Sequence, residues 1–202
     1  MPLVYYRSRP LYEISIWKIT ENLDFFMNRL KEDGFQIADG LKIRHPDKRL
    51  QWFAARYLLD STHPAAAIKM KGKKPMITNG PEISFSHSGN YAALLLSHHN
   101  SGLDIQVYDE KVLRVEKKFV NEGDKHAVHA SDDLKKLSLI WSIKEAVFKF
   151  YTTQLPFKNV EIIAHDPVKN EVDVKVARNG KAVHHRLYAD FQDDLTLAYI
   201  IE

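Results

Sequence analysis

The sequence contains no cysteine. Disulfide bonds, thiolate catalysis and cysteine-ligated zinc are therefore excluded. No apolar run approaches the roughly 20 residues that span a bilayer, and residues 1–7 lack the long apolar core of a secretory signal. From these absences we expect a cytoplasmic protein with no membrane partner.

A strong excess of charge of one sign is also absent. The 202 residues include 29 basic and 26 acidic side chains, which gives a net charge of +3. Because this balance does not indicate a nucleic-acid-binding surface, we expect no nucleic-acid partner. One stretch is locally basic, and it is typical either of a solvated turn or of a site for a small phosphate-rich ligand. It contains Lys69, Lys71, Lys73 and Lys74.

The composition that is present is that of an ordered globular protein, with 45% apolar, 27% charged and 11% aromatic residues. In the first hundred residues the hydrophobic patterns predict a strand, two helices and, after a loop with a short strand, a strand hairpin. The predicted ranges are 11–19 for the strand, about 22–34 and 47–62 for the helices, 67–80 for the loop, and 83–86 and 91–96 for the hairpin.

The second hundred residues repeat this order of elements. A strand at 102–107 precedes helices at 112–120 and 131–152, and residues 160–201 read as three strands separated by turn residues. We therefore predict an α+β fold with two similar halves.

The two halves are expected to cover residues 1–100 and 101–202. Their correspondence rests on faint similarities, such as the tryptophans of the two long helices, Trp52 and Trp141. The second half is expected to carry the metal site discussed next.

Asp104 breaks the rule that aspartate is poor in the interior of an apolar strand. It is either a strand-end residue that faces water or a carboxylate with a partner. Gln106 lies two residues on and hence on the same face of the strand. Two oxygen-bearing side chains on one face are able to contact a hard cation such as Mg²⁺.

Lys144 and Glu145 stand where the apolar stripe of the helix at 131–152 should continue. Glu145 and Lys149 are four residues apart and share a helix face, so a simple surface ion pair explains these two. That reading explains Lys144 poorly. The alternative is that Glu145 completes a metal site with Asp104 and that Lys149 faces a metal-bound phosphate.

Ser86 and His87 lie beside a predicted turn and offer a hydroxyl and an imidazole that are suited to holding a phosphate. A polar turn with capping serines is the plain alternative. A serine–histidine hydrolase pair is not expected, because adjacent strand residues point to opposite faces.

Three segments together resemble the signature motifs of Sfp-type 4′-phosphopantetheinyl transferases, in that family's order and at about its spacing. They are Ile83-Ser84-Phe85-Ser86-His87-Ser88-Gly89, Gly102-Leu103-Asp104-Ile105 and Trp141-Ser142-Ile143-Lys144-Glu145-Ala146-Val147-Phe148-Lys149. Two weaker segments add to the resemblance, which covers residues 48 to about 150. They are Lys71-Gly72-Lys73-Lys74-Pro75 and Phe119-Val120-Asn121-Glu122-Gly123-Asp124.

The resemblance implies a pseudo-dimer of two α+β halves with coenzyme A in the cleft between them. It implies that Asp104 and Glu145 bind Mg²⁺ and that Lys149 contacts the coenzyme A phosphates. The remaining residues that it implies for coenzyme A binding are Ser86, His87, Lys73, Lys74, Lys144, Arg49 and Arg56.

Two departures from the family pattern concern acidic residues. Many members have glutamate where this chain has Gln106, so this side chain is expected to be a weak ligand or to act through water. The acid that follows the phenylalanine segment, expected to act with Glu145 and Lys149 in catalysis, is Asp124 or, alternatively, Glu122.

The activity that the resemblance implies is Mg²⁺-dependent transfer of 4′-phosphopantetheine from coenzyme A to a serine of an apo acyl or peptidyl carrier protein. Such an enzyme serves fatty acid, polyketide or nonribosomal peptide synthesis. A monomer would suffice, because one chain carries both halves. Two alternatives stay open: a non-catalytic homologue that binds coenzyme A or a carrier protein, and another Mg²⁺-dependent phosphodiesterase such as a nuclease.

Overall fold

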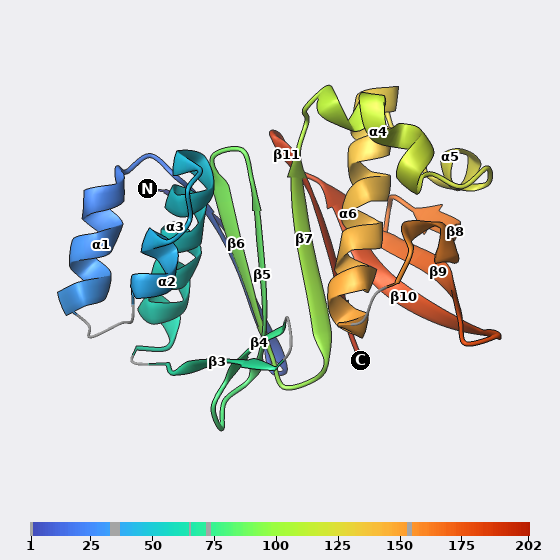
Figure 1. Cartoon of the computed structure of the whole chain (residues 1–202). Coiled ribbons are helices and arrows are strands. Elements are labelled where there is room, and N and C mark those ends of the chain that lie inside the picture. The colour runs from blue at the N-terminus through green and yellow to red at the C-terminus, as the bar shows by residue number, and fades with distance from the viewer. Residues whose placement is uncertain (1, 33–36, 65, 72–73, 153–154) are drawn as a thin grey trace. The chain divides into compact units, whose positions relative to one another are not determined.

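The computed structural model describes residues 2–32, 37–64, 66–71, 74–152 and 155–202. The chain divides into two compact units, Met1–His99 and Asn100–Glu202 (Figure 1). Each unit has its own antiparallel sheet, its own helices and its own hydrophobic core.

The first unit has a six-stranded sheet in the order β1-β2-β6-β5-β4-β3. Phe53 and Leu58 of helix α3 pack with Phe26 of helix α1 and Leu94 of strand β6 to form its core. The strands are β1 (Leu3–Arg9), β2 (Tyr12–Lys18), β3 (Ile68–Lys71), β4 (Lys74–Ile77), β5 (Glu82–Ser88) and β6 (Tyr91–Ser97). The helices are α1 (Leu23–Glu32), α2 (Ala38–Leu41) and α3 (Pro46–Thr62).

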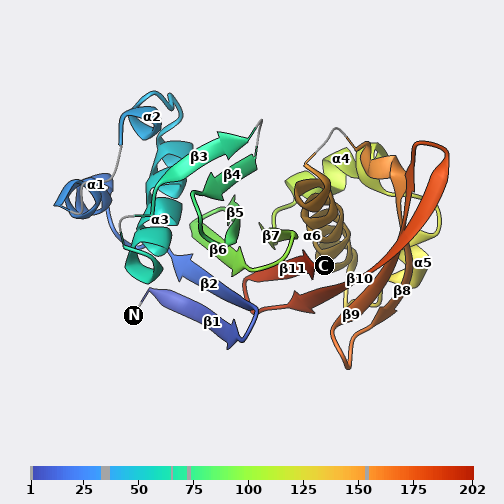
Figure 2. The same ribbon diagram turned by 90° about the horizontal axis from the view of Figure 1, so that it is seen from below.

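The second unit has a five-stranded sheet in the order β7-β11-β10-β9-β8. Its strands curve around the long helix α6, as Figure 2 shows. The strands are β7 (Ser101–Val107), β8 (Val160–Asp166), β9 (Glu171–Arg178), β10 (Lys181–Phe191) and β11 (Leu195–Ile201). The helices are α4 (Lys111–Phe119), α5 (Asp124–Ala127), α6 (Asp133–Tyr151) and a short 3₁₀ helix, η1 (Phe157–Asn159).

Helix α6 begins and ends where its sequence favours it. The side chain of Asp132 accepts a hydrogen bond of 2.8 Å from the backbone N–H of Lys135, which is an N-cap. At the other end Thr152 adopts a left-handed conformation with φ of 55°. These caps fix the span of the helix that carries Glu145 and Lys149.

The two units share one strand order. When β1 is set aside, the first sheet reads β2-β6-β5-β4-β3 and the second reads β7-β11-β10-β9-β8. In both sheets the first strand pairs antiparallel with the last, and the strands between them follow in reverse chain order. The predicted α+β class is confirmed, and this common topology supports the two similar halves that were expected.

Three details of the strands differ from the sequence-based expectations, and the short helices α2, α5 and η1 were not expected either. Residues 3–9 form the additional strand β1, residues 68–77 form two short strands instead of one, and residues 160–201 form four strands instead of three. The missed turn between β10 and β11 is closed by a hydrogen bond of 2.8 Å from the Gln192 N–H to the Leu195 carbonyl. It contains neither glycine nor proline, the residues that usually mark a turn in a sequence.

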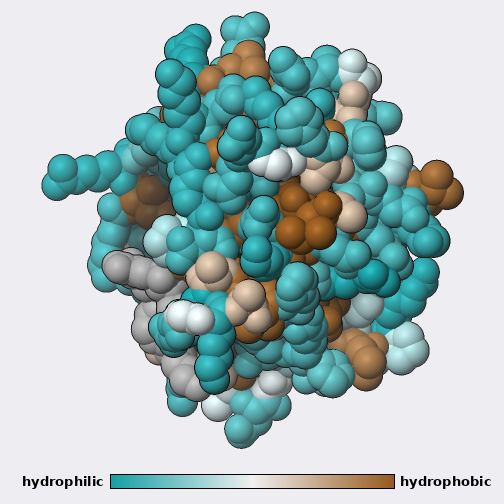
Figure 3. Space-filling view, turned by 90° about the vertical axis from the view of Figure 1, so that its right-hand side faces the viewer, coloured by the Kyte–Doolittle hydropathy of each residue, from teal (hydrophilic) through white to brown (hydrophobic). Residues whose placement is uncertain are grey.

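The face drawn in Figure 3 is mainly hydrophilic, with a few hydrophobic side chains among the polar ones. Such isolated apolar residues are ordinary on the surface of a globular protein. Among the described residues, no helix is both long enough and apolar enough to cross a membrane.

Candidate active site

Strand β7 and helix α6 approach each other closely at Gly102. A Cβ atom added to Gly102 would lie 2.1 Å from the backbone oxygen of Ala146 and 2.7 Å from the backbone nitrogen of Phe150. Both are backbone atoms that cannot rotate away, so the close packing requires glycine. This contact brings the strand that carries Asp104 against the helix that carries Glu145 and Lys149.

A hydrogen bond between buried side chains fixes the lengthwise position of α6 on the sheet. The hydroxyls of Ser142 on α6 and Thr196 on β11 lie 2.7 Å apart, and both side chains are fully buried. Thr196 is paired with Gln106 of β7 in the sheet. A shift of the helix along the sheet would therefore break a buried hydrogen bond, which is unfavourable.

Lys149 is bound to the strand that it faces. Its Nζ lies 2.7 Å from Asp104 Oδ1 and donates a hydrogen bond of 2.8 Å to the Leu103 carbonyl. The Lys149 side chain is 26% exposed and that of Asp104 is 8% exposed. The ion pair is thus partly open to solvent on the lysine side.

Glu145 lies within electrostatic reach of the same pair. Burial raises the pKa of its carboxyl to about 7, the Asp104 carboxylate adds to the rise, and Lys149 opposes it. Burial and a neighbouring like charge both favour proton uptake or binding of a cation. The arrangement therefore places two carboxyl groups beside the ammonium of Lys149.

Gln106 extends this site along β7. Its side chain is half-buried, and its amide nitrogen donates a hydrogen bond of 2.9 Å to the Val107 carbonyl. Over the described ranges no group of three or more histidine, aspartate and glutamate side chains is placed to hold a metal ion. Two carboxylates with one nearby amide nevertheless fit Mg²⁺, which binds through one or two carboxylates and fills its other positions with water and phosphate oxygens.

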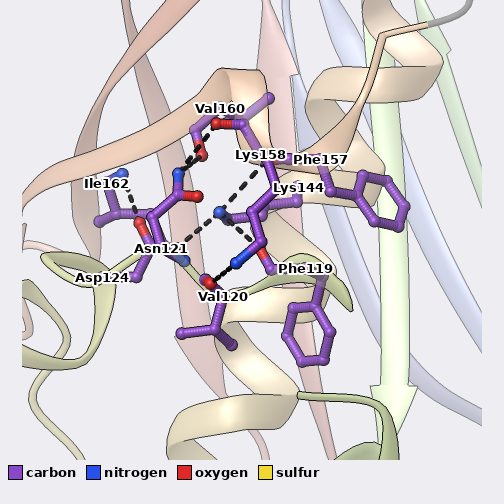
Figure 4. A network of polar contacts seen from close by, with 9 residues as sticks. All are labelled: Phe119, Val120, Asn121, Asp124, Lys144, Phe157, Lys158, Val160 and Ile162. Atoms are coloured by element: carbon purple, nitrogen blue, oxygen red, sulfur yellow. Dashed lines mark hydrogen bonds and ion pairs between the residues drawn. The ribbon is translucent and has the colours of Figure 1, made fainter. Parts of the chain in front are cut away.

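Lys144 and Asp124 lie elsewhere and form a second ion pair (Figure 4). Lys144 Nζ is 2.5 Å from Asp124 Oδ2, and both side chains are 0% exposed. The ammonium also donates to the Phe119 carbonyl at 2.8 Å and to the Phe157 carbonyl at 3.3 Å. These three acceptors match its three N–H donors, so the charge of Lys144 is fully used inside the protein.

Asp124 is equally occupied. Its Oδ2 accepts from the Asn121 N–H at 2.7 Å and its Oδ1 accepts from the Ile162 N–H at 2.9 Å. Burial lowers the pKa of the Lys144 ammonium, and Asp124 opposes that shift. The pair fastens the segment before α5 and the strand β8 to helix α6.

This burial bears on two of the roles expected from the sequence. Asp124 has no exposed surface with which to take a proton from a substrate, and Lys144 has none with which to touch a phosphate. Glu122, the other acid considered as a base, is exposed.

The expected residues of the first unit lie at several places within it. Ser86 is buried and His87 is exposed, as opposite faces of β5 require. Lys74 forms an ion pair of 2.6 Å with Glu82, and Arg49 donates to the Ile43 carbonyl at 2.8 Å. Lys73 lies outside the described residues.

Arg56 is held between two aromatic rings. Its guanidinium carbon lies 4.2 Å from the ring centre of Trp52 and 4.6 Å from that of Phe85. Burial lowers the pKa of this guanidinium to about 10, while the charge of Asp39 opposes the shift. It remains charged at neutral pH.

Residues 101–200 match the family model of the 4′-phosphopantetheinyl transferase superfamily. The second unit belongs to this superfamily. The match supports phosphopantetheinyl transfer in general, a reaction for which this superfamily uses coenzyme A as substrate. The matched residues of this phosphopantetheinyl transferase domain include Asp104, Glu145 and Lys149. No curated protein matches the chain.

Sequence reasoning assigned no supporting role to Gly102, Ser142 and Thr196, although the first two stand within the segments that resemble the family. The signal for Gly102 was its place in the strand before Asp104, since an interior glycine often marks a close backbone approach. Ser142 and Thr196 carry no such signal, because their hydrogen bond joins residues 54 positions apart.

Proposed function

We propose that this protein transfers 4′-phosphopantetheine from coenzyme A to a serine of an apo acyl or peptidyl carrier protein. In this reaction the serine oxygen forms a bond to the phosphorus that bears the pantetheine. The bond from that phosphorus to the bridging oxygen of the diphosphate breaks, and adenosine 3′,5′-bisphosphate leaves. The observation that carries the proposal is the meeting of Asp104, Glu145 and Lys149 within the segment that matches the superfamily.

In this proposal Asp104 and Glu145 hold Mg²⁺, and Gln106 contributes weakly or through water. A bound Mg²⁺ supplies positive charge that neutralises the diphosphate oxygens. Lys149 lies beside the same carboxylates and stabilises the negative charge that develops on the leaving bisphosphate.

The proton of the acceptor serine needs a base. Of the two acids considered, Glu122 is the exposed one, whereas the carboxylate of Asp124 is bound by Lys144 and two backbone N–H groups. We therefore assign the role of proton acceptor to Glu122 and a structural role to Asp124.

The residues proposed for the other phosphates of coenzyme A lie in the first unit. Arg56 contributes a fixed positive charge, because its guanidinium is held between two rings. The exposed imidazole of His87 is suited to the 3′-phosphate. Ser86, Arg49, Lys73 and Lys74 complete the proposed set.

The carrier protein is proposed to bind through opposite charge. Helix α4 exposes several basic side chains on its surface, and an acidic partner would complement them. These are Lys111, Arg114, Lys117 and Lys118.

The proposal is tested by the intact mass of an apo carrier protein after incubation with this protein, coenzyme A and Mg²⁺. The expected result is a gain of one phosphopantetheine that a chelator prevents. The matched controls are Glu145→Gln, expected to be inactive, and Glu171→Gln on β9, expected to be active. No gain on several acyl and peptidyl carriers, with coenzyme A still bound, would overturn the transfer and favour the non-catalytic alternative.

A further inference from the structure

The ammonium of Lys149 binds one oxygen of the Asp104 carboxylate, the group to which the proposed function assigns Mg²⁺. It lies 2.7 Å from Oδ1 and is held there by a second bond to the Leu103 carbonyl. A magnesium ion bonded to a carboxylate oxygen sits about 2.0–2.1 Å from it. Two cations on one carboxylate repel each other, so lysine and metal compete for Asp104.

Competition follows from the balance of charge as well as from position. Asp104 and Glu145 provide two acidic groups, and Lys149 acts electrostatically on both. With Lys149 in place, part of the attraction that a divalent cation would feel is already cancelled. With Lys149 drawn away, this opposing charge is removed from both carboxylates.

We propose that Lys149 is a built-in counter-ion that keeps the affinity of the free protein for divalent cations low until a phosphate-bearing ligand draws the ammonium away from Asp104. This inference rests on the proposed function, because it assigns Mg²⁺ to Asp104 and Glu145 and the phosphates to coenzyme A. It adds that the binding of the cation and of the diphosphate is coupled through one side chain.

Lys149 is the more exposed member of the ion pair, so its ammonium is the group that is able to move. Its side chain is 26% exposed, whereas that of Asp104 is 8% exposed, so the lysine is the partner that is able to turn toward a ligand. A phosphate that accepts the ammonium replaces the ion pair that Asp104 gives up. By thermodynamic reciprocity, the metal then strengthens binding of the phosphate ligand by the same factor.

The test measures binding of Mn²⁺, a spectroscopic substitute for Mg²⁺, to the full chain without substrates. Free Mn²⁺ is followed by electron paramagnetic resonance in titrations of the wild-type protein, Lys149→Met and Lys175→Met. Lys175 is the matched control, because it is a lysine paired with a carboxylate, Glu161, away from this site. Lys149→Gln repeats the measurement if Lys149→Met does not fold.

The expected result is that Lys149→Met binds Mn²⁺ alone about tenfold more tightly than wild type, within the usual range of coupling between sites. Lys175→Met should bind as wild type does. Coenzyme A should tighten Mn²⁺ binding in wild type, and the ratio of affinities with and without coenzyme A should fall about tenfold in Lys149→Met.

Unchanged or weaker Mn²⁺ binding by a folded Lys149→Met protein would overturn the inference. This failure is separable from failure of the proposed function. If the wild-type protein modifies carrier proteins but Lys149→Met binds Mn²⁺ no more tightly than wild type, only the counter-ion role of Lys149 is overturned. Tighter Mn²⁺ binding in Lys149→Met, together with no transfer by the wild-type protein to any carrier, would uphold the counter-ion and overturn the proposed function.

Discussion

Helix α6 carries two lysines that each pair with an aspartate, and the two pairs differ in almost every physical respect. Lys144 and Asp124 are 0% exposed, and the lysine has three acceptors for its three donors. Lys149 and Asp104 are 26% and 8% exposed, and a further carboxyl, Glu145, acts on them. The first pair is saturated by the protein, and the second lies beside a further carboxyl group.

Both pairs consist of a lysine and an aspartate, so residue type does not distinguish a structural pair from a candidate binding site. Solvent exposure and the charge of neighbouring groups do. Positions 144 and 149 are five residues apart, which places them on different sides of a helix with 3.6 residues per turn. One side of α6 meets the segment around α5 and the other meets β7. The same two residue types therefore serve two tasks on one helix.

The largest expected effect comes from breaking the saturated pair. Asp124→Ala leaves the buried Lys144 ammonium without its counter-charge, so we expect a loss of about 3–5 kcal/mol in the free energy of unfolding. Urea denaturation followed by circular dichroism measures it. The double variant Asp124→Leu with Lys144→Met should recover only the part of this loss that is due to the unpaired ammonium, because the Asn121 and Ile162 N–H groups still lack their acceptor. A double variant as unstable as the single one would contradict the explanation.

The partly exposed site of Asp104, Glu145 and Lys149 is called the open site below. Breaking it should reduce turnover and leave the free energy of unfolding nearly unchanged. In Glu145→Gln one proposed metal ligand loses its charge, and we expect the rate of carrier modification to fall by about 10²–10³-fold, the usual effect of losing one charge-stabilising group. Thermal unfolding serves as the control, since removal of a crowded carboxylate should not lower the melting temperature. Turnover within a few-fold of wild type would remove Glu145 from the metal site.

The contact that holds the open site together is expected to be the next most sensitive. Gly102→Ala forces a methyl group against the backbone of Ala146 and should cost about 1–3 kcal/mol of stability, as overpacking does. It should also reduce turnover, because β7 and α6 are pushed apart at Asp104. The matched control is Gly180→Asn in the β9–β10 turn, where no atom lies within 4 Å of an added Cβ. Its positive φ of 72° is one that asparagine tolerates.

The smallest effect is expected from the hydrogen bond that sets the position of α6. Thr196→Val keeps the shape of the side chain but leaves the Ser142 hydroxyl without this partner, at a cost of about 1–3 kcal/mol. The companion Ser142→Ala with Thr196→Val removes both hydroxyls and should be closer to wild type. Denaturation of the wild type, of both single variants and of the double variant in parallel measures the coupling between the two residues.

The sequence predicted the open site better than the saturated one. The positions of Asp104, Glu145 and Lys149 follow from strand and helix periodicity together with the family resemblance. Lys144 stood out as a charge on an apolar face, but its partner lies 20 positions earlier, beyond the reach of a helical pattern. Its burial and saturation depend on backbone carbonyls that only the folded chain brings together.

The elements of the fold also differ in how well the sequence predicts them. Hairpins marked by turn residues, such as the one at Asn179-Gly180 with φ of 49° and 72°, were predictable from sequence. The turn between β10 and β11 lacks these residues and was missed, although its backbone hydrogen bond closes it equally well. The strand order shared by the two units depends on pairing between distant segments and became visible only in the structure.

That shared strand order has an evolutionary reading. Ser15 pairs with Leu94 midway along β2 and β6, at the place where Asp104 pairs with Ala198 in β7 and β11. A gene that duplicated and fused would leave such a pair of copies, with the acid present in one of them alone. On this explanation we expect the position of Asp104 to be constrained by the chemistry proposed for it, whereas the buried Ser15 is expected to be constrained by packing.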